Sequence, residues 1–242
     1  MRNVLKEQGC TEYILQLIMN QKNLQVLEQT LQKDYKNLQG RSAILDCVAR
    51  DERARQFNVE IQGDNEGASP ERARYHSCLL DMNILSPREP FTGLPETYII
   101  FITRNDVLGY DRIICHITRK VEEEGKNFGD GSHIIYVNSK KREDTELGKL
   151  MHDLHCKESG EMHSKILASR VRELKETEKG VSEMCRDMEE IYGEGMEEGE
   201  RKKARETVLS LAELKMSEEQ ISQIVKMPLE VVQGWIEESL AI

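Results

Sequence analysis

The sequence predicts a mixed α/β domain followed by an α-helical region. Two strand-like runs, Ile44–Val48 and Phe57–Gln62, flank a polar loop, and Thr97–Thr103 is a continuous apolar run typical of a strand buried on both faces. From Glu161 onward the pattern becomes helical and highly charged. Charged residues make up 32% of the chain and aromatic residues 5%, which favours a helix-rich protein over an all-β sandwich.

The first predicted element is one or two helices over residues 11–32. Thr11 is a plausible N-cap, and Glu12 in the first turn either complements the helix dipole or lends a carboxylate to a nearby site. The apolar residues that recur at helical spacing are Ile14, Leu15, Leu17, Ile18, Leu24, Leu27 and Leu31.

The next element, Ser42 to Gln62, is a predicted hairpin that carries two carboxylates. If the chain folds back about Arg53, Asp46 and Glu60 are each seven residues from it and lie opposite one another. Side chains alternate along a strand, so Glu60 and Gln62 share one face. Directly opposed residues have Cβ atoms roughly 4.5–5.5 Å apart, and two carboxylates at that distance repel. The hairpin therefore predicts a site for a divalent cation, unless both acids simply lie on a solvent face.

A helix is predicted from Ser69-Pro70 to about Leu85, with Pro at its first position. Arg72 and Arg74 lie near its N-terminus, where their charge opposes the helix dipole, and Tyr75 belongs to its apolar stripe. Two interpretations of the arginines stay open: a solvated charged turn, or phosphate contact beside the acidic pair.

Three further strands are expected to complete the sheet. Thr97–Thr103 is predicted to be central, and Asp111–Thr118 and His133–Asn138 follow it. The order of elements describes a mixed α/β or α+β domain over residues 1–158.

The C-terminal part is predicted as a charged helical linker, residues 159–200, and a small helical element, residues 201–242. Three glycines between Gly193 and Gly199 predict a flexible break, because glycine costs roughly 1 kcal/mol per helical position. Ser217 opens a capping box and Pro228 starts a further helix, a pattern similar to helix-turn-helix. The segment Pro228–Leu240 has no Lys or Arg, which favours packing around Trp235 or homo-oligomerisation over DNA reading.

Net charge, apolar runs and cysteine spacing bear on the partners and the location expected for the protein. The net charge is −10, but residues 161–242 hold 12 Lys and Arg against 19 Asp and Glu, which leaves residues 1–160 close to neutral and able to carry a local basic surface. No apolar run reaches the roughly 18 residues of a membrane span and no leader follows Met1, so we expect a cytoplasmic protein. The six cysteines include no C-x-x-C pair, which argues against a disulfide framework.

A second metal cluster is considered near the end of the first domain. Its ligand types suit zinc, although ordinary packing residues fit the same pattern. The candidates are His152, His155, Cys156 and His163.

Residues 42–140 resemble the PD-(D/E)xK nuclease superfamily, and the run from Thr11 to about Glu190 resembles the recombination-promoting nuclease (Rpn) family, whose members are also described as transposases. The segments that carry the resemblance are LDCVARDERARQFNVEIQ, ERARYHSCLLDMNI, ETYIIFITRNDVLG, HIIYVN and LGKLMHDLHC. The resemblance implies a restriction-endonuclease-like core, with a mixed sheet flanked by helices, and DNA as the substrate.

The resemblance also implies roles for particular residues. Asp46 and Glu60 take the position of the metal ligands, with the main-chain carbonyl of Ile61 as the third protein ligand for Mg²⁺ or Mn²⁺. Gln62 stands where the superfamily usually has lysine, as it does in the similar E-x-Q subgroup. Glutamine can orient a water but carries no charge. Arg72, Arg74 and Tyr75 are the candidates for contact with DNA phosphate.

Two functions follow as hypotheses. The first is a magnesium-dependent DNA endonuclease in recombination or mobile-element biology. The second is a DNA-associated or protein-interaction module of the same fold whose nuclease site has decayed.

Overall fold

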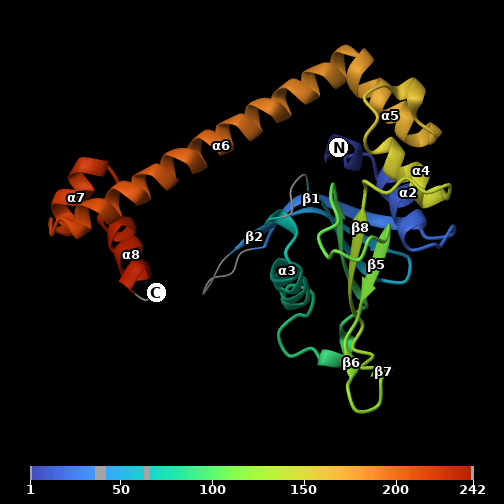
Figure 1. Cartoon of the computed structure of the whole chain (residues 1–242), viewed down its shortest axis with the longest axis horizontal. Coiled ribbons are helices and arrows are strands. Elements are labelled where there is room, and N and C mark those ends of the chain that lie inside the picture. The colour runs from blue at the N-terminus through green and yellow to red at the C-terminus, as the bar shows by residue number, and fades with distance from the viewer. Residues whose placement is uncertain (1, 36–41, 63–65, 241–242) are drawn as a thin grey trace. The chain divides into compact units, whose positions relative to one another are not determined.

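The computed structural model describes residues 2–35, 42–62 and 66–240, and the chain divides into two compact units, residues 1–177 and 178–242. Figure 1 shows the course of the chain. The first unit continues past residue 158 through α5 (Lys165–Glu176). The finer division of the sequence at residues 158 and 200 stays a prediction.

The first unit is built on a six-stranded mixed sheet, which confirms the predicted fold class. Its strand order is β1-β2-β3-β4-β8-β5. The pairs β3–β4 and β4–β8 are parallel, whereas β1–β2, β2–β3 and β5–β8 are antiparallel. The strands are β1 (Val26–Tyr35), β2 (Ala43–Asp51), β3 (Gln56–Gln62), β4 (Thr97–Thr103), β5 (Ile114–Ile117) and β8 (Ser132–Asn138).

The prediction for residues 11–32 is wrong in its second half. Helix α2 (Gln8–Ile18) follows the short α1 (Arg2–Leu5), but residues 26–35 form β1. Leu27, which the helical spacing assigned to an apolar face, is 54% exposed. Pairing of β1 with β2 along most of its length overrides the local helical pattern. Thr11 is no N-cap either, because it lies inside α2 and its hydroxyl donates to the Leu5 carbonyl at 3.2 Å.

The elements that follow the hairpin agree with the sequence. Helix α3 (Pro70–Met82) begins after Ser69, whose hydroxyl accepts the Arg72 N–H, and every residue of β4 is buried between β3 and β8. Helix α3 packs on the sheet over an apolar layer (Figure 1). The members of that layer are Tyr35, Leu45, Val48, Ala68, Ala73, Leu80, Ile99, Phe101 and Tyr136.

Helix α4 (Glu146–Asp153) contacts α2, and so does α5, so the N-terminal and later helices pack together. A small hairpin of β6 (Lys120–Val121) and β7 (Lys126–Asn127) extends beyond the main sheet (Figure 1). The predicted strand at residues 111–118 is shorter than expected and forms β5.

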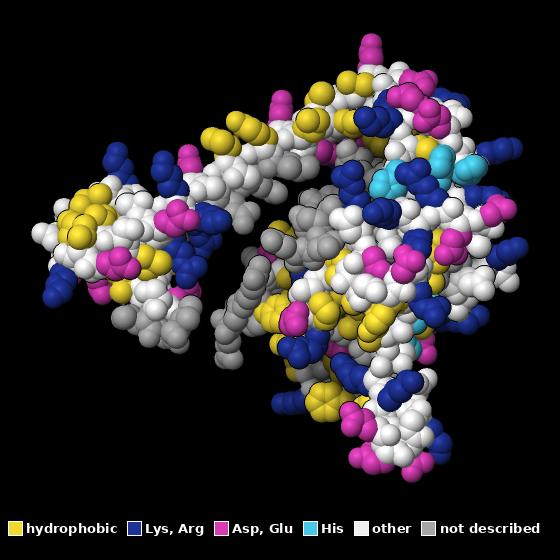
Figure 2. Space-filling model, viewed as in Figure 1, with side chains coloured by type: hydrophobic (Ala, Val, Ile, Leu, Met, Phe, Trp, Pro, Cys, Tyr) yellow, Lys and Arg dark blue, Asp and Glu magenta, His cyan; other side chains and the backbone are white. Residues whose placement is uncertain are grey.

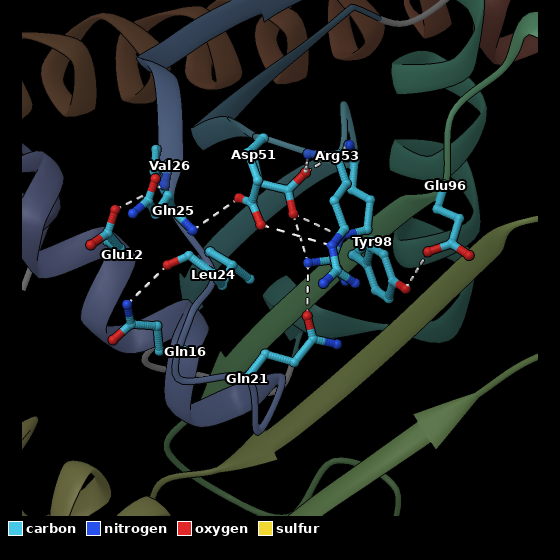
Figure 3. Close-up of polar contacts among 12 residues, drawn as sticks. Glu12, Gln16, Gln21, Leu24, Gln25, Val26, Asp51, Arg53, Glu96 and Tyr98 are labelled. Carbon is cyan, nitrogen blue, oxygen red and sulfur yellow. Dashed lines mark hydrogen bonds and ion pairs between the residues drawn. The ribbon is translucent and has the colours of Figure 1, made fainter.

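A buried ion pair fixes the turn between β2 and β3, at the end of the hairpin remote from Asp46 and Glu60. Asp51 accepts the main-chain N–H groups of Arg53 and Arg55, and its Oδ2 lies 2.6 Å from Arg55 Nη2. Arg55 also donates to Gln21 Oε1 at 2.8 Å. Figure 3 shows these contacts beside Glu12, whose carboxylate accepts the Val26 N–H at 2.9 Å. The turn residues therefore hold the loop after α2 and the start of β1 in place.

The second unit consists of α6 (Glu178–Glu213), α7 (Glu218–Val225) and α8 (Leu229–Leu240). The predicted break at Gly193–Gly199 is wrong, because α6 runs through it without interruption. The surrounding Glu, Met, Lys and Arg residues are strong helix formers, which offsets the cost of the glycines. The capping box at Ser217 is confirmed, and Val208, Ile221, Val232 and Trp235 form the apolar core of this unit.

Candidate functional site

The candidate site lies where the β2–β3 ladder ends and β3 continues beside β4. The last pair is Cys47 with Val59, and the same register continued by one residue places Asp46 opposite Glu60, as the sequence predicts. On its other side, Glu60 pairs with Phe101 of β4. The site therefore stands at the carboxyl end of β3, against the central strand of the sheet.

The two carboxylates bind main-chain groups of each other's strands. Glu60 Oε1 accepts the Asp46 N–H at 3.1 Å, and Asp46 Oδ2 accepts the Ile61 N–H at 3.3 Å. These bonds hold both acids at the same point between the strands. They also orient Ile61: the N–H and C=O of one residue in a strand point to the same edge, so the Ile61 carbonyl points toward Asp46 as well.

Glu60 is buried with no exposed surface, and Asp46 is 8% exposed. Burial and, next, the negative charge of Asp46 raise the pKa of the Glu60 carboxyl, while hydrogen bonds from Asp46 N–H and Asn58 and the charge of Arg72 oppose the shift. The leading cause of this upward shift is burial, and the adjacent Asp46 carboxylate adds to it. A divalent cation bound between the two carboxylates would favour their charged forms.

Gln62 lies on the same face as Glu60, as the alternation predicts, and its Nε2 donates to Glu60 Oε2 at 3.3 Å. The main-chain carbonyl of Gln62 accepts the main-chain N–H of Arg104, the first residue after β4, at 3.2 Å. The side-chain amide of Gln62 therefore lies beside the acidic pair, and its main chain lies next to the residue that follows β4.

Helix α3 contributes Arg72 and His76, one turn apart on the face toward Glu60. Arg72 Nη2 lies 3.6 Å from Glu60 Oε2, and His76 Nδ1 lies 3.7 Å from Glu60 Oε1. Arg72 Nε donates to His76 Nε2 at 3.3 Å. Because an arginine N–H can only donate, His76 Nε2 is the acceptor and the neutral ring carries its hydrogen on Nδ1, facing Glu60.

Sequence reasoning missed His76 and Asn58. His76 is 2% exposed, and Asn58 Nδ2 lies 3.5 Å from its Nδ1. The available signal was spacing: Arg72 and His76 are i and i+4 on a helix, and Asn58 and Glu60 are i and i+2 on a strand. Only the packing of α3 on β3 shows that these two pairs meet.

Among the predicted DNA-contact residues of α3, Arg72 is the one that lies beside Glu60. Arg74 is exposed on α3, and Tyr75 is half-buried there, whereas Arg72 is the arginine that reaches Glu60. Of the two arginines, the structure therefore brings only Arg72 to the acidic pair.

Cationic side chains follow the carboxyl ends of β4 and β8, the strands that with β3 form the parallel part of the sheet. Arg104 follows β4 and is exposed, and exposed Lys140 and Arg142 follow β8. Burial and, next, the charge of Arg142 lower the pKa of the His155 imidazole, and the charge of Arg104 acts in the same direction. Because parallel strands end at one edge of a sheet, these cations and Gln62 share that edge.

The site fits a hard divalent cation by its donors. Magnesium prefers oxygen ligands and keeps several waters, so two carboxylates and one carbonyl suffice. Asp46, Glu60 and the Ile61 carbonyl supply such a set at one point between β2 and β3.

The chain matches the model of the family described as PD-(D/E)XK nuclease family transposase over residues 12–193. No curated protein and no solved structure gives a significant match. Within the described part of the chain, no helix is both long and apolar enough to cross a membrane. The family match covers more than half of the sequence and includes the sheet, α3 and the acidic pair. The chain therefore belongs to the PD-(D/E)XK nuclease family transposases.

Proposed function

We propose that this protein is a magnesium-dependent DNA endonuclease of the recombination-promoting type, with Asp46, Glu60 and the Ile61 carbonyl as metal ligands. The observation that carries the proposal is the buried Glu60 carboxylate, held against Asp46 at the end of β3. Bound magnesium would polarise a phosphoryl oxygen and lower the pKa of a coordinated water.

The protein's own residues supply orientation and charge. Gln62 is placed to orient the attacking water through its amide, since it cannot act as a base. Arg72 is placed to contact the phosphate, and His76 positions Arg72 through the Nε–Nε2 hydrogen bond. Arg104, Lys140 and Arg142 extend the cationic surface on which a DNA backbone would lie.

The test is nicking of supercoiled plasmid by the full chain with Mg²⁺, with Mn²⁺ and with EDTA. We expect cleavage with either metal and none with EDTA. Asp46→Asn and Glu60→Gln should each abolish cleavage, because each removes a ligand charge. Glu28→Gln is the control, since Glu28 is an exposed glutamate paired with Arg50 on β1 and β2. Cleavage that survives both site substitutions would disprove the site.

Gln62 favours one alternative, a module of the same fold that binds DNA without cutting it. The amide lacks the positive charge that a lysine would bring to the developing phosphorane. Metal-independent DNA binding by the wild-type chain, together with no nicking under any metal, would identify that alternative.

A further inference from the structure

A second cluster of metal-ligating side chains lies at the end of α4, apart from the acidic pair on β2 and β3. Asp153 is the last residue of α4, and the chain then turns so that the His155 N–H donates to the His152 carbonyl and the Cys156 N–H to the Asp153 carbonyl. This turn brings the Cys156 thiol back to His152. Figure 2 shows histidine side chains gathered on this face of the molecule.

The donor atoms already have the spacing of a tetrahedral zinc site. His152 Nδ1 lies 3.4 Å from Cys156 Sγ and 3.3 Å from Asp153 Oδ1, and the three donor atoms lie within 4.8 Å of one another. Zinc binds nitrogen at about 2.0–2.1 Å and sulfur at about 2.3 Å, which places neighbouring N and S ligands roughly 3.5 Å apart. One ion therefore fits among these atoms with little rearrangement.

His163 lies beside this group of three residues. Its ring centroid lies 4.7 Å from that of His152, at an interplanar angle of 56°. Its main-chain N–H donates to Asp153 Oδ1 at 2.8 Å, and Ser164 N–H donates to Oδ2 at 2.7 Å. The buried Asp153 carboxylate thus fastens the segment before α5 beside the end of α4, and the exposed His163 ring can complete a four-ligand set.

His155 does not belong to this set, although the sequence pattern included it. Its Nε2 is hydrogen-bonded at 2.9 Å to the Oγ of Ser139, the residue that directly follows β8. The Cys156 thiol, by contrast, lies 3.4 Å from His152 Nδ1, within the group of three donor atoms.

We propose that His152, Asp153, Cys156 and His163 form a structural zinc site that links the end of α4 to the segment before α5. The mixed N, O and S donors select zinc over magnesium, which prefers oxygen alone. Four protein ligands leave no open position, as is usual for a structural rather than a catalytic ion. The site is independent of Asp46 and Glu60.

The experiment uses cobalt(II) as the probe, added to the metal-free full-length protein. We expect one equivalent to produce a thiolate-to-cobalt charge-transfer band and the intense visible bands of tetrahedral cobalt, both lost when one equivalent of zinc is added. Cys156→Ser should remove the charge-transfer band, and His152→Gln should weaken cobalt binding at least tenfold.

Three variants serve as controls. His155→Gln and Cys185→Ser, which change a neighbouring histidine and an exposed cysteine, should keep the cobalt spectrum, and so should Glu60→Gln of the proposed magnesium site. Circular dichroism identifies any variant that fails to fold. His163→Gln keeps the thiolate and should alter only the visible bands. Absence of a charge-transfer band in the wild type, or its persistence in Cys156→Ser, would refute the zinc site.

Discussion

Glu60 is a buried carboxylate whose ionisation costs the folded protein stability. It is fully buried next to Asp46, and the pKa of its carboxyl is raised. A raised pKa in the folded state means that the folded chain prefers Glu60 protonated. The free energy of unfolding must therefore fall as pH rises from the ordinary value for glutamate, near 4.3, through the raised value.

We expect Glu60→Gln to be more stable relative to wild type at about pH 8 than at about pH 4 in EDTA, because the variant cannot ionise. Urea unfolding at both pH values measures the difference. Millimolar magnesium should stabilise only the wild type and narrow the gap at the higher pH. In Glu28→Gln the sign should be opposite, because a hydrogen bond from Arg50 lowers the pKa of Glu28. If the difference in unfolding free energy between Glu60→Gln and wild type did not change with pH, the raised pKa of Glu60 would be contradicted.

The two arginines of α3 offer a matched pair. Arg72 lies 3.6 Å from Glu60, whereas Arg74 is exposed elsewhere on the helix. We expect Arg72→Ala to lower the plasmid cleavage rate roughly 10²-fold, the order seen when one donor to a developing charge is removed. Arg74→Ala should stay within about twofold of wild type. Equal losses in both variants would indicate a diffuse cationic effect instead.

At this scale, the sequence alone placed Asp46 opposite Glu60 and Gln62 beside it, because strand alternation and hairpin register are local properties. It did not indicate His76. A helix and a strand separated in sequence meet only through packing, and no local period encodes that contact.

Among the elements, buried β4 and capped α3 were predicted with nearly their observed bounds. Their signals, a continuous apolar run and a Ser-Pro start, reflect burial and capping. Residues 26–32 were mispredicted because leucine spacing fits a helix, while the pairing partner, β2, begins only at Ala43. Strand propensity depends more on such partners than helix propensity does.

Glycines in two helices should respond in opposite directions to substitution by alanine. A Cβ at Gly195 in α6 meets nothing within 4 Å, whereas one at Gly148 in α4 would lie 1.9 Å from the Glu143 carbonyl oxygen. We expect Gly195→Ala to stabilise α6 by about 1 kcal/mol. Gly148→Ala should destabilise the first unit, since the chain before α4 must shift. Thermal unfolding followed by circular dichroism compares the two variants. A higher melting temperature in Gly148→Ala would contradict the prediction, because it would mean that the main chain at Glu143 moves aside at little cost.

For the molecule as a whole, charge is divided so that an acidic chain can still approach DNA. The net charge is −10, yet Arg72 lies beside Glu60, and exposed Arg104, Lys140 and Arg142 follow the carboxyl ends of β4 and β8. Phosphate contacts release counterions, so binding weakens with salt in proportion to their number.

We expect DNA binding by Asp46→Asn in EDTA to weaken with added salt, and Arg104→Gln or Arg142→Gln to lower the slope of log K against log salt by about 0.9 each. Fluorescence anisotropy with a labelled duplex measures the slope. Lys126→Gln, in the β6–β7 hairpin, is the control with a similarly exposed cation and should leave the slope unchanged. Unchanged slopes in both arginine variants would place the DNA elsewhere.

The order of strands has one more consequence, which concerns aggregation. The outer strands of the sheet are β1 and β5, and an unpaired strand edge is a template for another chain. β5 has only four residues, and β1 shifts register between Val26 and Glu28 and carries a positive φ at Gln32. Short and irregular edges are poor templates for strand addition. The central strand β4, TYIIFIT, has the uncharged, β-branched and aromatic composition of an amyloid-forming segment, and it is kept inside a sheet whose two edges resist intermolecular pairing.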